Sequence, residues 1–236
     1  MFGEKFKKLL NPKIWNENCV RKYNDGDRMR YDRSTKAAII DYSDLKEIGN
    51  TGIRVPAIGV GTWGIGGLIS PEYSKDKQWI ETLKAGINMG LKLIDTAEIY
   101  GGGHTEELVG EAIKSFNREE IFIISKVSPN NLRREDLIKS VKRSLGRLKT
   151  KYIDIYLIHW PEQNMPLREA MKTLENLVDT GFIRYIGVSN FNLELLEEAR
   201  SYLSKYDIVV NQVKYNLLDR TIEKDLLPYC LSLIHI

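Results

Sequence analysis

The chain has few cysteines, no long apolar segment and no strong net charge. Its two cysteines, Cys19 and Cys230, lie far apart and show no metal-ligand spacing, which argues against a disulfide scaffold or a zinc site. The longest apolar stretches are about seven residues, whereas crossing a bilayer takes roughly 20, and no secretory signal opens the chain. We therefore expect a cytoplasmic protein with no membrane partner and no metal.

The formal net charge is only +3 over 236 residues, which gives no reason to expect a nucleic-acid partner. The charge is uneven, because residues 1–36 hold ten Lys and Arg against five Asp and Glu. Residues 1–40 also contain turn-forming pieces and lack a sustained period. We interpret them as a basic, weakly structured extension. A short amphipathic helix broken at Pro12, a solvated tail and a mis-annotated start are all compatible with this segment.

A regular alternation begins at residue 44. The pieces DLKEI and IRV flank the turn GNTG, which predicts a β-hairpin over residues 44–55. Apolar runs that read as strands then recur along the chain, at 57–61, 91–95, 121–127, 152–159, 182–189 and 207–213.

Helical patterns separate these runs, with apolar residues at i, i+3, i+4 and i+7. They cover 77–90, 104–116, 134–148, 167–181 and 192–205. We expect Thr105 to open the second helix, Asn192 to cap the last, and Gly181 to close the fourth. Strands that alternate with helices predict a parallel sheet. The period of about 25 to 34 residues fits a barrel of eight units, but an open doubly wound sheet would show the same alternation.

The segment GVGTWG places Gly59, Gly61 and Gly64 in a formal dinucleotide-binding pattern. That fingerprint requires a helix to begin at the third glycine. Here the segment continues as a loop, in which Pro71 blocks an early helix. We expect a loop at the rim of the barrel that holds Trp63 over a pocket.

The sequence ends after six predicted strands, whereas closing an eight-stranded barrel requires two more. We expect an incomplete parallel (β/α)8 TIM barrel over residues 41–230, with the hairpin at its N-terminal side. The last six residues, LSLIHI, match one reading frame of a transposon-end adapter used in library preparation. We therefore predict that residues 231–236 are adapter-derived.

Four polar side chains follow or end three of the apolar runs. They are Asp95, Tyr100, Lys126 and His159. Parallel strands bring their carboxyl ends to one rim, where barrel enzymes keep their active sites. Singly, each residue has an ordinary explanation, such as a turn carboxylate, a packing aromatic or a core histidine; together they predict a proton-donating site.

The chemistry follows from the phenol. A carbonyl accepts hydride more readily when its oxygen receives a proton, and tyrosine donates one if its pKa falls from about 10. An ammonium about 4 Å away, at an effective dielectric of about 20, stabilises the phenolate by roughly 4 kcal/mol, or about three pKa units. We expect Lys126 to lower the pKa of Tyr100, with Asp95 holding the ammonium and His159 orienting a substrate.

These residues lie in segments that resemble the aldo-keto reductase family. The segments, in family order, are GVGTWGIGG, DTAEIYGGGHTEELVGEAI, IISKV, YIDIYLIHWP, IRYIGVSNF and NQVKYN. The resemblance implies an eight-stranded barrel whose hairpin plugs the bottom, and NADPH-dependent reduction of aldehydes or ketones. It makes Tyr100 the proton donor, Lys126 and Asp95 its tuning pair, and His159 the group that orients the substrate.

The resemblance also implies further contacts around the cofactor and substrate. Ser189, Asn190 and Gln212 would meet the nicotinamide carboxamide. The nicotinamide ribose would meet Gly61, Thr62, Trp63 and Asp95. The substrate pocket would be lined by Trp63, Tyr100, His159 and Trp160. The chain departs from the family in about 40 extra residues at its start and in lacking strands seven and eight. The stacking aromatic and the 2′-phosphate loop that follow those strands are therefore missing, which predicts weak cofactor affinity and leaves NADPH and NADH both possible.

We predict a monomeric oxidoreductase that acts on a small carbonyl substrate. Two alternatives stay open. One is a cofactor-binding regulatory or interaction subunit of the same fold, and the other is an inactive fragment.

Overall fold

The computed structural model describes residues 30–32, 37–39 and 45–232, and the chain divides into two compact units, residues 1–44 and 45–236. In the first unit, β1 (Arg30–Asp32) pairs antiparallel with β2 (Ala37–Ile39). Sequence reasoning expected only weak structure there and missed this ladder. The helix considered around Pro12 lies outside the described residues.

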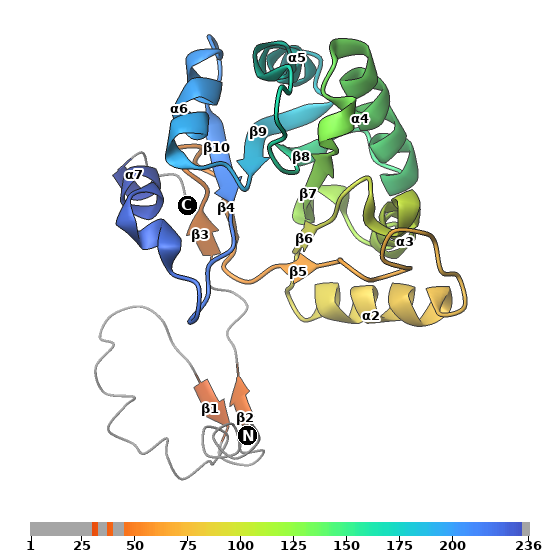
Figure 1. Ribbon diagram of the computed structural model, residues 1–236. Coiled ribbons are helices and arrows are strands. Elements are labelled where there is room, and N and C mark those ends of the chain that lie inside the picture. Colours follow the sequence, from red (N-terminus) through yellow and green to blue (C-terminus); the bar gives the residue numbers. More distant parts are fainter. Residues whose placement is uncertain (1–29, 33–36, 40–44, 233–236) are drawn as a thin grey trace, which may run out of the picture. The chain divides into compact units, whose positions relative to one another are not determined.

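The second unit is built on a six-stranded parallel sheet in which neighbours follow the order of the chain (Figure 1). The strands are β5 (Val60–Gly61), β6 (Leu93–Asp95), β7 (Phe122–Val127), β8 (Ile153–Ile158), β9 (Ile183–Ser189) and β10 (Ile208–Gln212). Each predicted run therefore holds a strand, although the first is much shorter than the expected 57–61. Both β7 and β8 are buried at every residue, as expected for strands covered on both faces.

Helices occupy the crossovers between these strands (Figure 1). They are α2 (Asp76–Asn88), α3 (His104–Ile113), α4 (Arg134–Leu148), α5 (Leu167–Asp179) and α6 (Leu193–Ser201), and α7 (Leu226–Ser232) follows β10. The five predicted helices are confirmed, and α7 was not predicted. Their buried residues recur at helical spacing: in α4, Leu137, Val141, Leu145 and Leu148 all face the core.

The two faces of the sheet have different covers. On one face, strand residues such as Ile123 and Tyr156 pack with buried residues from the helices in one large cluster. On the other face, a hairpin of β3 (Leu45–Glu47) and β4 (Arg54–Pro56) provides the cover. The second cluster joins hairpin residues to strand residues only, namely Ile48, Val55, Phe122, Ile124, Ile155, Leu157 and Val209. The predicted hairpin is thus confirmed.

The sheet is curled rather than flat. Gln212 ends β10 and Asp95 ends β6, four strand spacings away, which would be about 19 Å in a flat sheet. Yet Gln212 Nε2 donates to Asp95 Oδ2 over 2.8 Å. The strands therefore bend round a common interior, with the helices outside, and form part of a barrel. The expected incomplete TIM barrel is confirmed for these six strands.

Two of the three predicted helix ends agree with the structure. Asn192 caps α6 by accepting a hydrogen bond from the backbone N–H of Leu195, and Gly181, after α5, has a φ of 75°. The expectation for Thr105 is wrong. The N-cap of α3 is Gly103, with a φ of 100°, and the Thr105 hydroxyl donates instead to the carbonyl of Ile65, 2.5 Å away.

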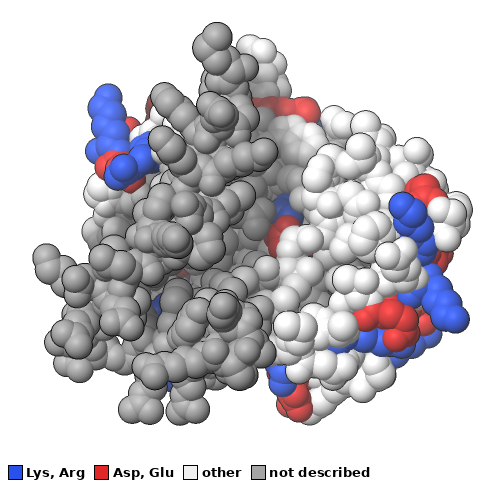
Figure 2. Space-filling model, turned by 90° about the horizontal axis from the view of Figure 1, so that it is seen from below, with Lys and Arg blue, Asp and Glu red and all other residues white. Residues whose placement is uncertain are grey.

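The described part of the chain contains no helix with both the length and the apolar character needed to cross a bilayer. Where the described residues are visible in Figure 2, Lys and Arg lie beside Asp and Glu rather than in a patch of one sign.

Candidate active site

The four predicted catalytic side chains come together at one rim of the curled sheet. Asp95 is the last residue of β6, Lys126 is the penultimate residue of β7, and His159 directly follows β8. Tyr100 begins the 3-10 turn η3 (Tyr100–Gly103), which leads into α3. The sheet places them there because its strands are parallel, so that their carboxyl ends meet at the same edge.

The Lys126 ammonium is at the centre of this group. Its Nζ donates to Asp95 Oδ1 at 2.6 Å, to the carbonyl of Thr96 at 3.0 Å and to the Tyr100 hydroxyl at 3.2 Å. An ammonium has three donors, and all three are therefore used. Because Lys126 is only 1% exposed, these three contacts set the direction in which its side chain points.

The Tyr100 hydroxyl also lies 3.5 Å from His159 Nε2, and the tautomer of the imidazole decides which of the two donates. His159 Nδ1 is buried and has no hydrogen-bond partner among the described residues. Burial, and secondly the Lys126 charge, lower the pKa of His159 to about 4. The imidazole is therefore neutral at neutral pH and acts as a hydrogen-bonding group rather than a cation.

The expected lowering of the tyrosine pKa is wrong for this structure. Burial, and secondly the negative charge of Asp95, raise the pKa of Tyr100 to about 12. Sequence reasoning judged the ammonium strong enough to outweigh the opposing effect of desolvation, whereas burial and the Asp95 charge prevail. Burial also lowers the pKa of Lys126, opposed by Asp95 and then Glu106. The phenol consequently keeps its proton at neutral pH, which is the state that a proton donor needs.

Aromatic rings surround the phenol. The Trp63 ring meets Tyr100 edge-on with centroids 4.8 Å apart, and the Trp160 ring lies 4.6 Å from His159. Trp63 is 55% exposed, so it borders the site without sealing it. It belongs to the loop between β5 and α2, and α2 begins only at Asp76. This confirms that GVGTWG is not followed directly by a helix.

The predicted cofactor-binding residues adjoin the same group. The Thr62 hydroxyl donates to the Asp95 carbonyl at 2.8 Å, and the Ser189 hydroxyl donates to the Gln212 carbonyl at 2.9 Å. Asn190, with a φ of 61°, donates from Nδ2 to Ser189 Oγ at 3.0 Å and to the His159 carbonyl at 3.3 Å. A Cβ added at Gly61 would meet nothing within 4 Å, so the rim is open there.

These contacts close into a ring around the rim, in which two of the links are made to the main-chain carbonyls of His159 and Gln212. Gln212 completes it, because its Nε2 donates to the carboxylate that also binds Lys126. In order, the ring is Asp95, Lys126, Tyr100, His159, Asn190, Ser189 and Gln212. Every residue predicted to be catalytic or to meet the nicotinamide carboxamide is therefore a member.

The ring can bind a carboxamide, because two of its side chains offer hydrogen-bond acceptors. Asn190 and Gln212 use their amide nitrogens inside the ring, whereas their side-chain oxygens have no partner among the described residues. Two amide acceptors at one rim suit the NH₂ group of a nicotinamide carboxamide. The residues present thus fit the group that the sequence resemblance implied.

Sequence reasoning did not find the tertiary contacts by which three consecutive residues, His104, Thr105 and Glu106, fix the first turn of α3. His104 lies between Asp76 of α2 and Glu107, with both nitrogens 2.9 Å from a carboxylate oxygen. Burial lowers its pKa, but hydrogen bonds to Glu107 and Asp76 outweigh burial and raise it. Thr105 binds the loop after β5, and Glu106 binds β7 and α4. The run HTEE after three glycines was the available signal.

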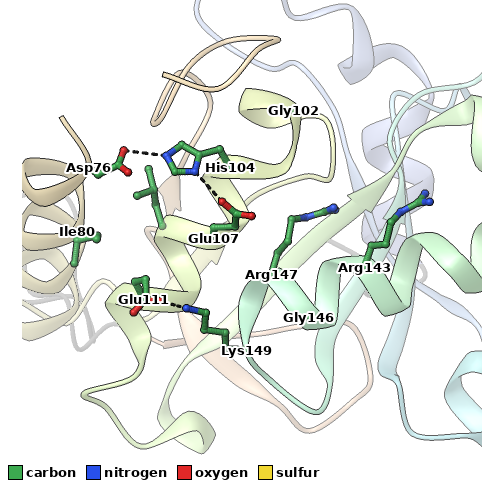
Figure 3. Close-up of a pocket in the computed structure, with 11 residues that line it drawn as sticks. Asp76, Ile80, Gly102, His104, Glu107, Glu111, Arg143, Gly146, Arg147 and Lys149 are labelled. Atoms are coloured by element: carbon green, nitrogen blue, oxygen red, sulfur yellow. Dashed lines mark hydrogen bonds and ion pairs between the residues drawn. The ribbon is translucent and has the colours of Figure 1, made fainter. Parts of the chain in front are cut away.

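A cavity of about 610 Å³ lies apart from the ring, between α2, α3 and α4 (Figure 3). Figure 3 shows His104 between Asp76 and Glu107, and the ion pair of Lys149 with Glu111. No member of the ring lines this cavity. Its cations are already paired with carboxylates, so the cavity is a surface hollow outside the site.

The fold and its rim define a parallel α/β-barrel protein with a buried, protonated phenol beside an ammonium. The family model for the aldo/keto reductase family matches residues 57–233, and the chain therefore belongs to that family.

Similar curated proteins are longer than this chain. Aldo-keto reductase YhdN of Bacillus subtilis (strain 168) is 40% identical over 195 residues, which cover 79% of this chain and 58% of that protein. Methylglyoxal reductase YeaE of Escherichia coli (strain K12) is 40% identical over 178 residues, which cover 75% and 61%. An NADH-specific methylglyoxal reductase of the same organism is 34% identical over 205 residues, covering 78% and 62%. The chain spans about three fifths of these relatives.

Solved structures show the same fold. The thermostable aldo-keto reductase Tm1743, in complex with the inhibitor epalrestat, matches with a TM-score of 0.78 and 56% identity, over 80% of this chain and 69% of that one. An aldo/keto reductase from Klebsiella pneumoniae, in complex with NADP and acetate, matches with a TM-score of 0.68 and 40% identity, over 77% and 62%.

Proposed function

We propose that the full-length protein reduces a small aldehyde or ketone to an alcohol, with NADPH as the hydride source and Tyr100 as the proton donor. One observation carries this proposal: the Tyr100 hydroxyl accepts a hydrogen bond from the Lys126 ammonium, 3.2 Å away, at an open rim. A pKa raised to about 12 is consistent with a phenol that keeps its proton at neutral pH. Membership of the family and the NADP-bound relative from Klebsiella pneumoniae support it.

The roles of the chain's own residues follow from their contacts. As Tyr100 gives up its proton, negative charge develops on an oxygen that already accepts a hydrogen bond from Lys126. Electrostatic stabilisation of a charge that appears only during reaction lowers the barrier selectively. The neutral His159, 3.5 Å from the same hydroxyl, would orient the substrate oxygen toward Tyr100.

Bound NADPH would supply the hydride. Asn190 and Gln212 would hold its carboxamide through their side-chain oxygens, with Ser189 fixing the Asn190 amide. Gly61, Thr62 and Asp95 would border the ribose. Trp63 and Trp160 would form the walls of the substrate pocket, because their rings adjoin Tyr100 and His159.

Methylglyoxal is the substrate with which to begin, because two of the similar proteins carry that activity in their names. The full-length protein is mixed with methylglyoxal and NADPH or NADH, and loss of the reduced-nicotinamide absorbance is followed. Turnover that disappears in Lys126→Met, a variant of similar length without the charge, supports the proposal. Both nucleotides are needed, since one relative is NADH-specific.

An interaction or regulatory subunit remains the alternative. All four catalytic groups are present and in contact, which favours the enzyme. Nucleotide binding without turnover of any aldehyde or ketone in a broad panel would contradict the enzymatic proposal. The monomeric state, the cytoplasmic location, the division at residues 40–41 and the adapter origin of 231–236 stay predictions.

A further inference from the structure

We propose that Glu106 is a positioning residue of this site, which ties the turn that carries Tyr100 to the strand that carries Lys126 and helps to keep the ammonium charged. The inference deepens the proposed function and rests on it for its link to catalysis. The tie itself can be tested without turnover.

The tie is direct on the strand side. Glu106 Oε1 accepts a hydrogen bond from the Ser125 hydroxyl at 2.6 Å, and Ser125 is the neighbour of Lys126 in β7. Adjacent strand residues point to opposite faces, so Glu106 holds β7 from the helix side while Lys126 reaches into the rim. Both Glu106 and Ser125 are 0% exposed, which removes competition from water.

The tie is equally short on the tyrosine side. Glu106 is in the first turn of α3, which follows η3 (Tyr100–Gly103) without a linker. Residues 101–103 of that turn are glycines with positive φ angles, and they carry no side chain that could anchor the turn. Fixing the first turn of α3 to β7 therefore fixes the distance between the Tyr100 hydroxyl and the Lys126 amine, which is 3.2 Å.

Arg147 of α4 completes the arrangement. Its guanidinium donates to Glu106 Oε2 at 2.7 Å. A Cβ added at Gly103 would lie 3.0 Å from the Arg147 Nε. The guanidinium can therefore pack directly on the backbone of the turn because position 103 has no side chain. Figure 3 shows Arg147 projecting from α4 beside Gly146. A buried carboxylate with an ion-pair partner and a hydroxyl donor is satisfied in its charged form.

Glu106 also acts on Lys126 through its charge. The groups around Lys126 at the rim are Asp95, Tyr100 and His159. Burial lowers the pKa of Lys126, and the negative charges of Asp95 and then of Glu106 oppose this effect. Around Glu106 are Arg147 and Ser144 of α4, Ser125 of β7 and Tyr156 of β8. The net pKa of Glu106 is raised, because burial outweighs the opposing effects of Arg147, Ser125 and Ser144.

Two substitutions separate position from charge. Glu106→Gln keeps an oxygen for Ser125 but removes the charge, whereas Ser125→Ala removes the tie to β7 and leaves the charge. The matched control is Glu175→Gln, which removes another buried glutamate charge, one that binds Ser204 and Lys205.

The first readout is the titration of the Lys126 side chain by NMR of the protein without nucleotide, assigned with Lys126→Met. We expect Glu106→Gln to lower the Lys126 pKa by about one unit, as a unit charge does from about 10 Å at an effective dielectric of about 20. Ser125→Ala and Glu175→Gln should leave it unchanged. An unchanged Lys126 titration in Glu106→Gln overturns the charge role.

The second readout is the split between kcat and KM for carbonyl reduction. We expect Ser125→Ala to lower kcat about 10-fold to 100-fold with little change in KM, because displaced reacting groups slow chemistry more than binding. Glu106→Gln should also lower kcat, because it removes a charge that favours the Lys126 ammonium and weakens the contact with Arg147. Glu175→Gln should lower thermal stability but not kcat. If Glu106→Gln and Ser125→Ala have the same kcat as Glu175→Gln and the unaltered protein, the positioning role is overturned. No turnover by the unaltered protein would count against the proposed function instead, and the Lys126 titration would still decide the charge role of Glu106.

Discussion

The Lys126 ammonium and the Asp95 carboxylate form an ion pair between two neighbouring strands, with Nζ 2.6 Å from Oδ1. Lys126 is 1% exposed and Asp95 is 21% exposed, so the pair lies at the boundary between core and solvent. The same carboxylate accepts a hydrogen bond from Gln212. Asp95 therefore connects the proton-donating half of the rim to the half that would hold the nicotinamide.

Asp95→Asn should weaken the fold as well as the site. It leaves the buried ammonium without its anionic partner, and we expect the free energy of unfolding to fall by about 1.5–3 kcal/mol in urea titrations. The control is Asp179→Asn, which removes an exposed partner of Lys205 and should produce no measurable change. An equal loss of unfolding free energy in the two variants would contradict the claim that the buried Asp95–Lys126 pair stabilises the fold more than an exposed ion pair does.

His159 should stay neutral across the physiological range. Its pKa of about 4 predicts that one of the three histidines of the chain shows no titration by NMR between pH 5.5 and 8, and that this signal is absent in His159→Gln. His104, whose pKa is raised, should titrate above its ordinary value. A His159 midpoint near 6.5 would contradict the burial and charge effects invoked here.

The His159 shift also predicts the sign of an acid effect on stability. The folded protein keeps this imidazole neutral down to about pH 4, whereas the unfolded chain protonates it near pH 6.5. The unfolded state thus binds more protons between these values, so the stability contribution falls as pH drops through that window. Denaturant midpoints at pH 7 and pH 4.5 should differ less in His159→Gln than in the unaltered protein.

Gly103 and Gly146 should respond oppositely to alanine. Gly103 has a φ of 100° and lies against Arg147, so Gly103→Ala should destabilise the protein by about 1–3 kcal/mol. Gly146 lies within α4, and a Cβ there meets nothing within 4 Å, so Gly146→Ala should stabilise by about 0.5–1 kcal/mol. Thermal unfolding of both variants checks the pair, and destabilisation by Gly146→Ala would contradict it.

Much of the fold could be predicted from the sequence because its signals are local. Continuous apolar runs identify β7 and β8, and the i, i+3, i+4 pattern identifies α4. The positions of Asp95, Lys126 and His159 at one rim follow once the strands are parallel. Periodicity alone left the barrel and the open sheet equally possible. The curl depends on contacts such as that of Gln212 with Asp95, 117 positions apart.

The features that sequence reasoning missed depend on distant partners or on burial. Thr105 looked like a helix cap because its local pattern is right, but the carbonyl of Ile65 takes its hydroxyl. The pKa of Tyr100 had the wrong expected direction, because burial and Asp95 together outweigh the nearby ammonium. Glu106 looked like an ordinary first-turn acid, and only the packing of α3 on β7 and α4 reveals its buried partners.

The central claim, that Tyr100 donates the proton, is tested most directly by comparing carbonyl reduction by Tyr100→Phe and Tyr152→Phe. Each substitution removes one hydroxyl, and the Tyr152 hydroxyl is buried without a hydrogen-bond partner among the described residues. We predict that Tyr100→Phe lowers kcat by at least about 100-fold, as expected for loss of a general acid, while Tyr152→Phe retains the original rate. Turnover by Tyr100→Phe at the rate of the unaltered protein would contradict the assignment.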